Sequence, residues 1–412
     1  MKHTLALPLT LALGLASPAL AGPDPESLST GLTPEAWQEV RAAAEGQTVY
    51  WHAWGGSTTT NAFIDWVGTR VKEEYGVTLE HVKLSDTADA VGRVLAEQQA
   101  GQNEDGAVDL IWINGPNFAA MKGQNLLFGP FAESLPNWQY VDVENKDVQT
   151  DFTVPVEGYE APWAMAQVVF IHDEARLPEP PRSMAALLEW AKANPGRFTF
   201  PQPPDFLGST FLKQALIDLN GTDEALSEPV DAADDYAAST EALWSFIDAL
   251  TPNLWRQGRA YPQTGPRQLQ LIADGEVDLA ISFSPGEASA AIANNELPPT
   301  ARTYVLDGGT LGNASFVAIP YNSSAKSGAM IVADFLMSPE AQARAQDPEV
   351  LGYGTVLAMD KLGADERAAF EALDLGVATL SPEELGKAQP EPHPSWTTRL
   401  TEDWIAKHGV KE

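Results

Sequence analysis

Two polar loops offer hydrogen-bond donors of the kind that hold a small solute. Gly56, Ser57 and Thr58 stand between a predicted strand and a predicted helix, and Ser209 and Thr210 precede another predicted helix. Free backbone N–H groups and hydroxyls at helix starts bind anions and strongly polar groups. Capping of the two helices explains the same residues equally well, and both roles are compatible.

Aromatic side chains stand at the ends of predicted strands or where the chain crosses between predicted lobes. Trp54, Trp112 and Trp163 share this position, and core filling is the better explanation for any one of them. Three together favour a cleft that stacks on a flat ring or surrounds an organic cation, for which Glu160, Asp205 or Glu287 would supply negative charge.

Further polar residues in the same loops would orient a solute through directional hydrogen bonds. They are Asn114, Asn117, Ser284 and Asn313.

The motifs of enzymes and metal sites are absent from the sequence. It has no cysteine, no Gly-x-Ser-x-Gly elbow, no His-x-x-x-His spacing, and no phosphate-binding or dinucleotide-binding glycine loop. His52 lies inside a predicted strand and is better explained as a packed residue. We therefore expect no catalytic residues, metal or cofactor. The alternative is an exported hydrolase or glycan-active enzyme, which should show two carboxylates about 5 to 10 Å apart across the cleft, or a serine touching a histidine.

Composition excludes several partners. Among 412 residues, 57 are acidic and 25 are basic, and the formal charge is −32. Such a chain does not bind nucleic acid or an anionic membrane surface by charge. The acidic excess mostly forms a solvated surface, and its bias toward cationic solutes is weak because salt screens it.

The N-terminal residues 1–21 read as a secretory signal peptide. Lys2 precedes an apolar run from Leu5 to Ala16, and Ala19-Leu20-Ala21 forms a small-x-small cleavage site. The run is shorter than the roughly 18 residues needed to span a bilayer. We therefore expect cleavage before Gly22 and a soluble periplasmic protein.

The elements that position these residues alternate between strands and helices. Strands are predicted at 48–54, 77–84 and 108–113, with helices at 61–75 and from 86 or 87 to 101. This order predicts a parallel sheet with right-handed crossovers, in which ligands bind beyond the carboxyl ends of the strands.

A second unit repeats the pattern. Residues 274–282 echo residues 105–113, since each has a glycine turn, Val-Asp-Leu and an apolar strand. Between them, 158–171 contains a strand-like crossing segment, and 307–319 is a return crossing. Helices are predicted at 211–219 and 325–337. The sequence thus predicts two similar α/β lobes.

In these features the chain resembles the periplasmic solute-binding proteins of ABC importers, extracellular solute-binding protein family 1. The motifs that carry the resemblance are, in order, the opening Val-Tyr-Trp-His-Ala-Trp-Gly-Gly, the two Val-Asp-Leu strands, Ala-Ile-Pro-Tyr-Asn-Ser at 318–323 and Phe-Leu-Met-Ser-Pro-Glu-Ala-Gln at 335–342. Trp112-Ile-Asn-Gly115 and Pro204-Asp-Phe-Leu-Gly-Ser-Thr-Phe211 look like a narrower branch, near the thiamine, polyamine and iron binders.

The resemblance implies a type II periplasmic-binding-protein fold with two lobes joined by crossing hinge strands. Lobe I would comprise 22–160 and 308–345, and lobe II would comprise 161–307 and 346–412. A monomeric receptor would close on a small solute and deliver it to a membrane ABC permease with its ATPase. The preferred solute is a nitrogenous organic cation or heterocycle, thiamine-like or polyamine-like. The alternative is an anion or a ferric complex, and the scarcity of tyrosine in the cleft loops counts against iron.

Overall fold

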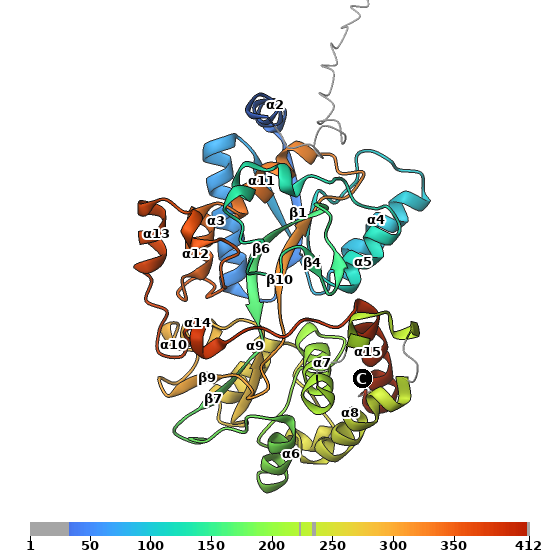
Figure 1. Ribbon diagram of the computed structural model, residues 1–412, viewed down its shortest axis with the longest axis vertical. Helices are drawn as coiled ribbons and strands as arrows, with labels where there is room; N and C mark the ends of the chain where they lie inside the picture. Colours follow the sequence, from blue (N-terminus) through green and yellow to red (C-terminus); the bar gives the residue numbers. More distant parts are fainter. Residues whose placement is uncertain (1–32, 222–223, 233–235, 410–412) are drawn as a thin grey trace, which may run out of the picture.

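The computed structural model describes residues 33–221, 224–232 and 236–409. The predicted signal peptide, residues 1–21, lies outside this range. Within the described residues, no helix is both long and apolar enough to cross a membrane. Two lobes are stacked along the long axis of the molecule, and β6 runs from the first toward the second (Figure 1).

Lobe I is built on a five-stranded mixed sheet in the order β2-β1-β3-β10-β6. β1 pairs in parallel with β2 and with β3, as the alternation of strands and helices predicts, whereas β10 runs antiparallel to β3 and β6. The strands are β1 Thr48–Trp54, β2 Thr78–Leu84, β3 Leu110–Ile113, β6 Glu160–Gln167 and β10 Gly312–Ala318.

Helices cover both faces of this sheet, and a short hairpin stands beside it. The helix α3 illustrates why they form: Ser57 caps its first turn, Phe63, Ile64 and Val67 face the core, and Gly76 ends it in a left-handed conformation. The elements are α2 Pro34–Ala44, α3 Thr58–Tyr75, α4 Ala88–Gln99, α5 Pro116–Gly123, α11 Lys326–Leu336, α12 Pro339–Gln346, α13 Ala364–Glu371, β4 Thr150–Asp151 and β5 Val154–Pro155.

Lobe II differs from lobe I more than the sequence repeat predicts. Its named strands form a three-stranded sheet in the order β8-β7-β9, and the central β7 is antiparallel to both neighbours. The prediction of a second parallel unit is therefore wrong for this sheet. The reason is that β7 arrives from the hinge, so β8 and β9 run back toward it. The strands are β7 Val169–Asp173, β8 Leu279–Ser282 and β9 Ala301–Tyr304.

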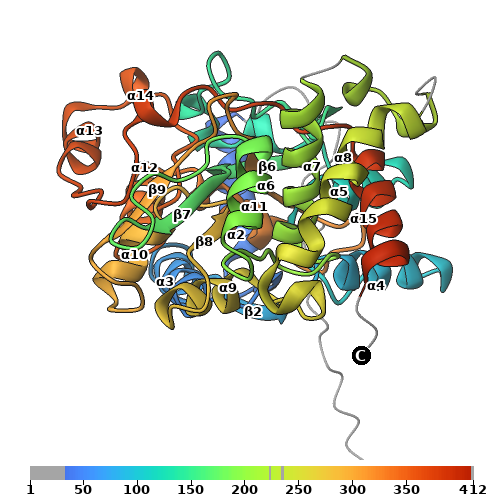
Figure 2. The same cartoon turned by 90° about the horizontal axis from the view of Figure 1, so that it is seen from below.

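Seen from below, the lobe II helices α6, α7, α8 and α15 stand together beside the strands (Figure 2). Their apolar faces share a core with Phe198, Phe200 and Phe211. α7 begins five residues earlier than the predicted helix start at 211, because Asp205 caps it. The helices of the lobe are α6 Met184–Ala193, α7 Phe206–Asn220, α8 Tyr236–Leu250, α9 Gly265–Ala273, α10 Glu287–Ala293 and α15 Pro394–His408.

Three segments cross between the lobes. They are the junction of β6 and β7 at Val168, the link 305–311 that leads into β10, and 372–376, which leads from α13 in lobe I to Ala378 in a core of lobe II. Residues 386–393, which connect α14 Pro382–Leu385 to α15, run beside the second crossing, where the N–H of Gln389 bonds the carbonyl of Thr310. The expected boundaries need correction at two places. Residues 161–167 belong to the sheet of lobe I, and apolar residues from Leu351 to Phe370 pack in its core rather than in lobe II.

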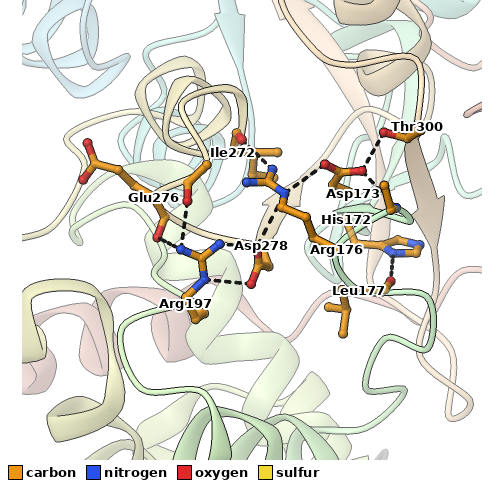
Figure 3. Close-up of polar contacts among 11 residues, drawn as sticks. His172, Asp173, Arg176, Leu177, Arg197, Ile272, Glu276, Asp278 and Thr300 are labelled. Atoms are coloured by element: carbon orange, nitrogen blue, oxygen red, sulfur yellow. Dashed lines mark hydrogen bonds and ion pairs between the residues drawn. The ribbon is translucent and has the colours of Figure 1, made fainter.

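A network of ion pairs and hydrogen bonds connects several loops of lobe II to the end of β7 (Figure 3). Asp278, whose side chain is 12% exposed, accepts hydrogen bonds from the guanidinium of Arg197. The guanidinium of Arg197 also bonds the carbonyls of Gly275 and Glu276. Arg176 Nε lies 3.7 Å from Asp278 and 2.9 Å from Asp173. The network thus joins the end of β7, the loop after α6 and the loop before β8.

Removing Asp278 should destabilise the protein. Asp278→Ala leaves the half-buried guanidinium of Arg197 without its anionic partner, while Arg176 keeps Asp173, so we expect the free energy of unfolding to fall by about 2 kcal/mol. Glu189→Ala removes a carboxylate that is 73% exposed and pairs with Lys192; it should cost about 0.5 kcal/mol or less. Denaturant melts of both variants provide the measurement, and equal effects would contradict the structural role of the network.

Candidate functional site

The lobes touch along a seam, where the predicted site loop after β8 meets residues 351–352 of lobe I. Gly286, at the start of α10 in lobe II, donates its N–H to the carbonyl of Gly352 at 3.1 Å, and their backbones are packed against one another. Nearby, the Ser284 hydroxyl approaches the carbonyl of Leu351 at 3.5 Å. The lobes therefore touch through backbone atoms at this point, with no room for an added side chain.

The loop after β1 forms one wall of the seam. Trp54 is half-buried and its indole lies directly over Gly56, where a Cβ atom would come within 2.4 Å of the ring. Ser57 accepts the N–H of Thr60 and caps α3, whereas Gly56 and Thr58 are exposed. Helix capping by Ser57 is thus observed, and the exposed backbone beside it is free to meet a solute.

A group of aromatic rings lies behind this wall. The Trp163 ring is fully buried between Phe63 at 6.0 Å and Trp112 at 4.8 Å, and Tyr353 follows at 5.8 Å. Because Trp163 fills the core of lobe I, we withdraw it from the proposed solute contacts. Trp112 is only partly buried and stays in the proposed set.

Asp205 and Asp86 bring two carboxylates near the mouth of the seam, one from each lobe. Asp205 Oδ1 accepts the N–H of Leu207 at 2.9 Å and caps α7, while Asp86 Oδ1 accepts the N–H of Ala88. Burial, together with the nearby charge of Asp86, raises the pKa of Asp205 to about 6. Among the described residues, no protein donor bonds Asp205 Oδ2. A cation in the seam would find this oxygen available.

Glu287 supplies a further carboxylate on the lobe II side. Ser282 donates its hydroxyl to Glu287, and burial raises the pKa of that carboxyl group. The Glu287 charge in turn raises the pKa of Tyr353, which burial already raises, to about 12. Tyr353 thus lies between the Trp163 cluster and Glu287, and it lines the seam although sequence reasoning did not select it.

The remaining predicted residues separate into two groups. Asn114 donates to the carbonyl of Ala314 at 2.6 Å and Asn117 is half-buried at the start of α5, so both remain at the carboxyl end of β3. Thr210 is fully buried inside α7, and Ser209 Oγ is bonded to Thr401 within lobe II. We therefore withdraw Ser209 and Thr210, since the earlier start of α7 turns them inward.

Asn313 takes part in a buried ionic group that the sequence analysis missed. It donates to Glu391 Oε1 at 3.2 Å, while Lys213 Nζ lies 2.6 Å from Glu391 Oε2. Lys213 is visible in the sequence as one base within an otherwise apolar stretch of α7. A cavity of about 40 Å³ borders Asn313 and Glu391. That volume suits water rather than an organic solute.

Two carboxyl groups of lobe I, those of Asp151 and Glu160, are fully buried. Asp151 accepts the N–H of Gly115 at 2.6 Å, and burial raises its pKa to about 8. Glu160 is fully buried, neither of its carboxyl oxygens has a protein partner among the described residues, and burial raises its pKa well above the usual range. Both groups therefore favour the protonated form in the folded state. We withdraw Glu160 as a source of charge for a solute, because its side chain is buried in lobe I.

These groups give stability a definite pH dependence. A carboxyl group whose pKa is raised by folding stabilises the folded state at low pH, and this contribution is lost as pH rises through the folded pKa. For Asp151 the loss spans about pH 4 to 8, and Asp334, whose pKa burial raises to about 7, acts in the same direction.

We expect the thermal midpoint to be higher at pH 5 than at pH 8, by roughly 3 to 6 °C. Glu160→Gln should flatten the profile, whereas Glu133→Gln at an exposed position should not. Calorimetry across this range provides the measurement. A midpoint that rises with pH would contradict the assignment.

The contacts that would indicate an enzyme have simpler explanations in this structure. His393 Nδ1 and Ser395 Oγ are 2.9 Å apart, but these residues cap α15, and the Ser395 hydroxyl also accepts the N–H of Val230. Asp205 and Asp86 both use one oxygen as a helix cap. These contacts are explained by the helix starts, and the described residues contain no cluster of three or more metal-ligating side chains.

Comparison with known proteins agrees with this two-lobed arrangement. The profile of the bacterial extracellular solute-binding proteins matches residues 66–361. Protein YnjB of Escherichia coli (strain K12) is 42% identical over 374 residues, which cover 91% of this chain and 94% of that protein.

Solved structures share the fold at low sequence identity. The periplasmic binding protein AfuA from Actinobacillus pleuropneumoniae, with exogenous fructose-6-phosphate bound, has a TM-score of 0.62 at 13% identity and covers 89% of this chain and 99% of its own. A putative spermidine/putrescine ABC transporter from Listeria monocytogenes gives 0.59 at 19%, with 87% and 98% covered. The apo ferric ion-binding protein A of Pasteurella haemolytica gives 0.60 at 13%, with 89% and 98% covered. The expected type II periplasmic-binding-protein fold is confirmed.

Proposed function

This chain belongs to the bacterial extracellular solute-binding proteins, and we propose that it is the receptor of an ABC importer that captures a nitrogenous organic cation between its lobes. It works in the periplasm after export, and it passes the solute to a membrane permease with its ATPase. It acts by binding and hinge closure rather than by catalysis.

The negative charge of the loops at the seam is the observation that favours a cationic solute. Its loops contain the carboxylates Asp205 and Glu287 and no lysine or arginine; they are 54–58, 112–117, 205–210, 282–287 and 351–354. Lys83, on the neighbouring strand, is exposed and packs the aliphatic part of its side chain against Gly55. A bound cation would relieve the repulsion between Asp205 and Asp86, whereas an anion would add to it.

Aromatic side chains support the organic character of the solute. Trp54 and Trp112 are partly exposed at the lobe I side, and Phe206, 47% exposed, stands in edge contact with Phe283 on lobe II. Rings of this kind attract ammonium groups and stack on flat heterocycles. The proposed solute contacts are therefore Trp54, Gly56, Ser57, Thr58, Trp112, Asn114, Asn117, Asp205, Ser284, Glu287 and Tyr353.

A thermal-shift panel tests the choice. Thiamine, spermidine and putrescine should include at least one compound that raises the midpoint, by several degrees at concentrations far above Kd. Fructose-6-phosphate and ferric citrate, the anionic and ferric probes, should leave it unchanged. Stabilisation by the last two alone would replace the cation with the alternative solute class. No shift with any compound of a broader cation and heterocycle library would also contradict the proposal.

A further inference from the structure

The tip of the β4–β5 hairpin touches lobe II through residues that are not among the proposed solute contacts. The ring of Phe152 lies 4.2 Å from Nζ of Lys213 on α7, and the Thr153 hydroxyl donates to the carbonyl of Ser227 at 3.2 Å. Both contacts join lobe I to lobe II. Any separation of the lobes at this point must break them.

The backbone of this tip is unusual. Phe152 and Thr153 have φ angles of 47° and 70° and form a two-residue turn between β4 and β5. Turns of this type are dominated by Asn and Gly, because other side chains are disfavoured at positive φ. An aromatic and a β-branched residue held in this conformation mark a position where the side chains serve a purpose beyond the turn.

The partner of Phe152 is a cation that needs shielding. Lys213 is fully buried and bonds Glu391 in the segment 386–393, and the centroid of the Phe206 ring lies 5.7 Å from its ammonium. A buried ion pair is favourable only when its geometry is good and its hydrogen bonds are satisfied. The Phe152 ring completes this enclosure from lobe I, and it adds a cation–π attraction.

The same hairpin also reaches the cleft loop. Asp151 accepts the N–H of Gly115, and the Phe152 ring packs so closely on Gly115 that a Cβ atom there would be 2.9 Å away. Gly115 itself follows Asn114 at the carboxyl end of β3. The hairpin therefore connects Lys213 of lobe II to the loop that lines the seam.

We propose that Phe152 and Lys213 form an interlobe latch that favours the closed arrangement of the lobes even without solute. Closure places the aromatic ring over the ammonium and removes water from the Lys213–Glu391 pair, while opening hydrates that pair. The latch sets the balance between open and closed forms and so tunes solute affinity without touching the solute. Its operation does not depend on which solute the receptor carries.

Distance measurement on the solute-free protein tests the latch. Because the chain has no cysteine, spin labels at Glu144→Cys in lobe I and Ala185→Cys in lobe II report only the interlobe distance; both positions are exposed. In the doubly labelled protein with no further substitution, electron-electron double resonance should show a population with a short interlobe distance, which corresponds to the closed form. Phe152→Asn should lower the ratio of closed to open forms about tenfold, and Phe152→Leu, which keeps bulk without a π face, about threefold.

Two further variants separate the latch from a structural role. Lys213→Met keeps the length of the side chain and removes its ammonium group. It should shift the ratio of closed to open forms in the same direction as Phe152→Asn. Tyr50→Asn removes an aromatic side chain that is 44% exposed on β1, and it should leave the ratio unchanged. Phe152→Asn should still unfold cooperatively, since asparagine suits the turn. The latch would be overturned if the interlobe distances of the protein without these substitutions showed only the open form. It would also be overturned if neither Phe152→Asn nor Lys213→Met changed the distance distribution.

Discussion

Placing a methyl group on Gly286 should reduce solute affinity about 100-fold. A Cβ atom there would lie 2.5 Å from both the Cα and the carbonyl oxygen of Gly352, which belong to the opposite side of the seam. The φ of Gly286 is −91°, so alanine fits its backbone and the penalty is steric. Gly286→Ala should therefore hold the lobes apart while each lobe folds normally.

The matched control is Gly92→Ala in α4, where an added Cβ atom meets nothing within 4 Å. Calorimetric titration with the cation selected by the thermal-shift panel compares the two variants. The Gly92 variant should bind like the unmodified protein. Full affinity in Gly286→Ala would show that closure at the Gly286–Gly352 contact is not needed for binding.

Removing the charge of Asp205 should weaken binding of an organic cation by about 30- to 100-fold. Asp205→Asn keeps a good helix cap for α7, because asparagine caps as well as aspartate does. The change therefore removes the carboxylate without removing the helix start. A loss of this size corresponds to the roughly 2 to 3 kcal/mol of a hydrogen bond to a charged group.

Asp231→Asn makes the same change of net charge at an exposed position of lobe II and should have little effect. Titrations at two salt concentrations distinguish a local contact from long-range attraction, since screening weakens only the latter strongly. If both variants bind the cation with the same affinity, Asp205 does not contact the solute. The main argument for a cationic solute then fails.

Much of the fold could be predicted from local pattern. The strand at 48–54 was predicted with the bounds that the structure shows, because its β-branched and aromatic run ends at two glycines. The hinge and the antiparallel sheet of lobe II could not, since they depend on which strands meet after the chain crosses between lobes. The same holds for 351–370, whose apolar residues reveal no preference for one core.

The candidate site was only partly predictable, because it also depends on tertiary packing. The loops after β1, β3 and β8 follow from the position of strand ends, and the loop after β8 lies at the seam. Trp163 was placed in the cleft because position along the chain cannot distinguish a cleft wall from the core behind it. Tyr353 and Glu391 come from late segments that reach the seam only through tertiary packing, although the Gly-Tyr-Gly run at 352–354 marks a turn with an aromatic residue.

The proposed receptor role depends most directly on what the protein carries from its cell. Native mass spectrometry of the periplasmic form, purified without unfolding, measures the mass of any solute bound between the lobes. We predict one nitrogen-containing organic cation per chain, present in the unmodified protein and lost from Gly286→Ala. A phosphate-bearing anion or a ferric complex at the same stoichiometry, or a cation retained equally by Gly286→Ala, would contradict capture of a cation by closure of this seam.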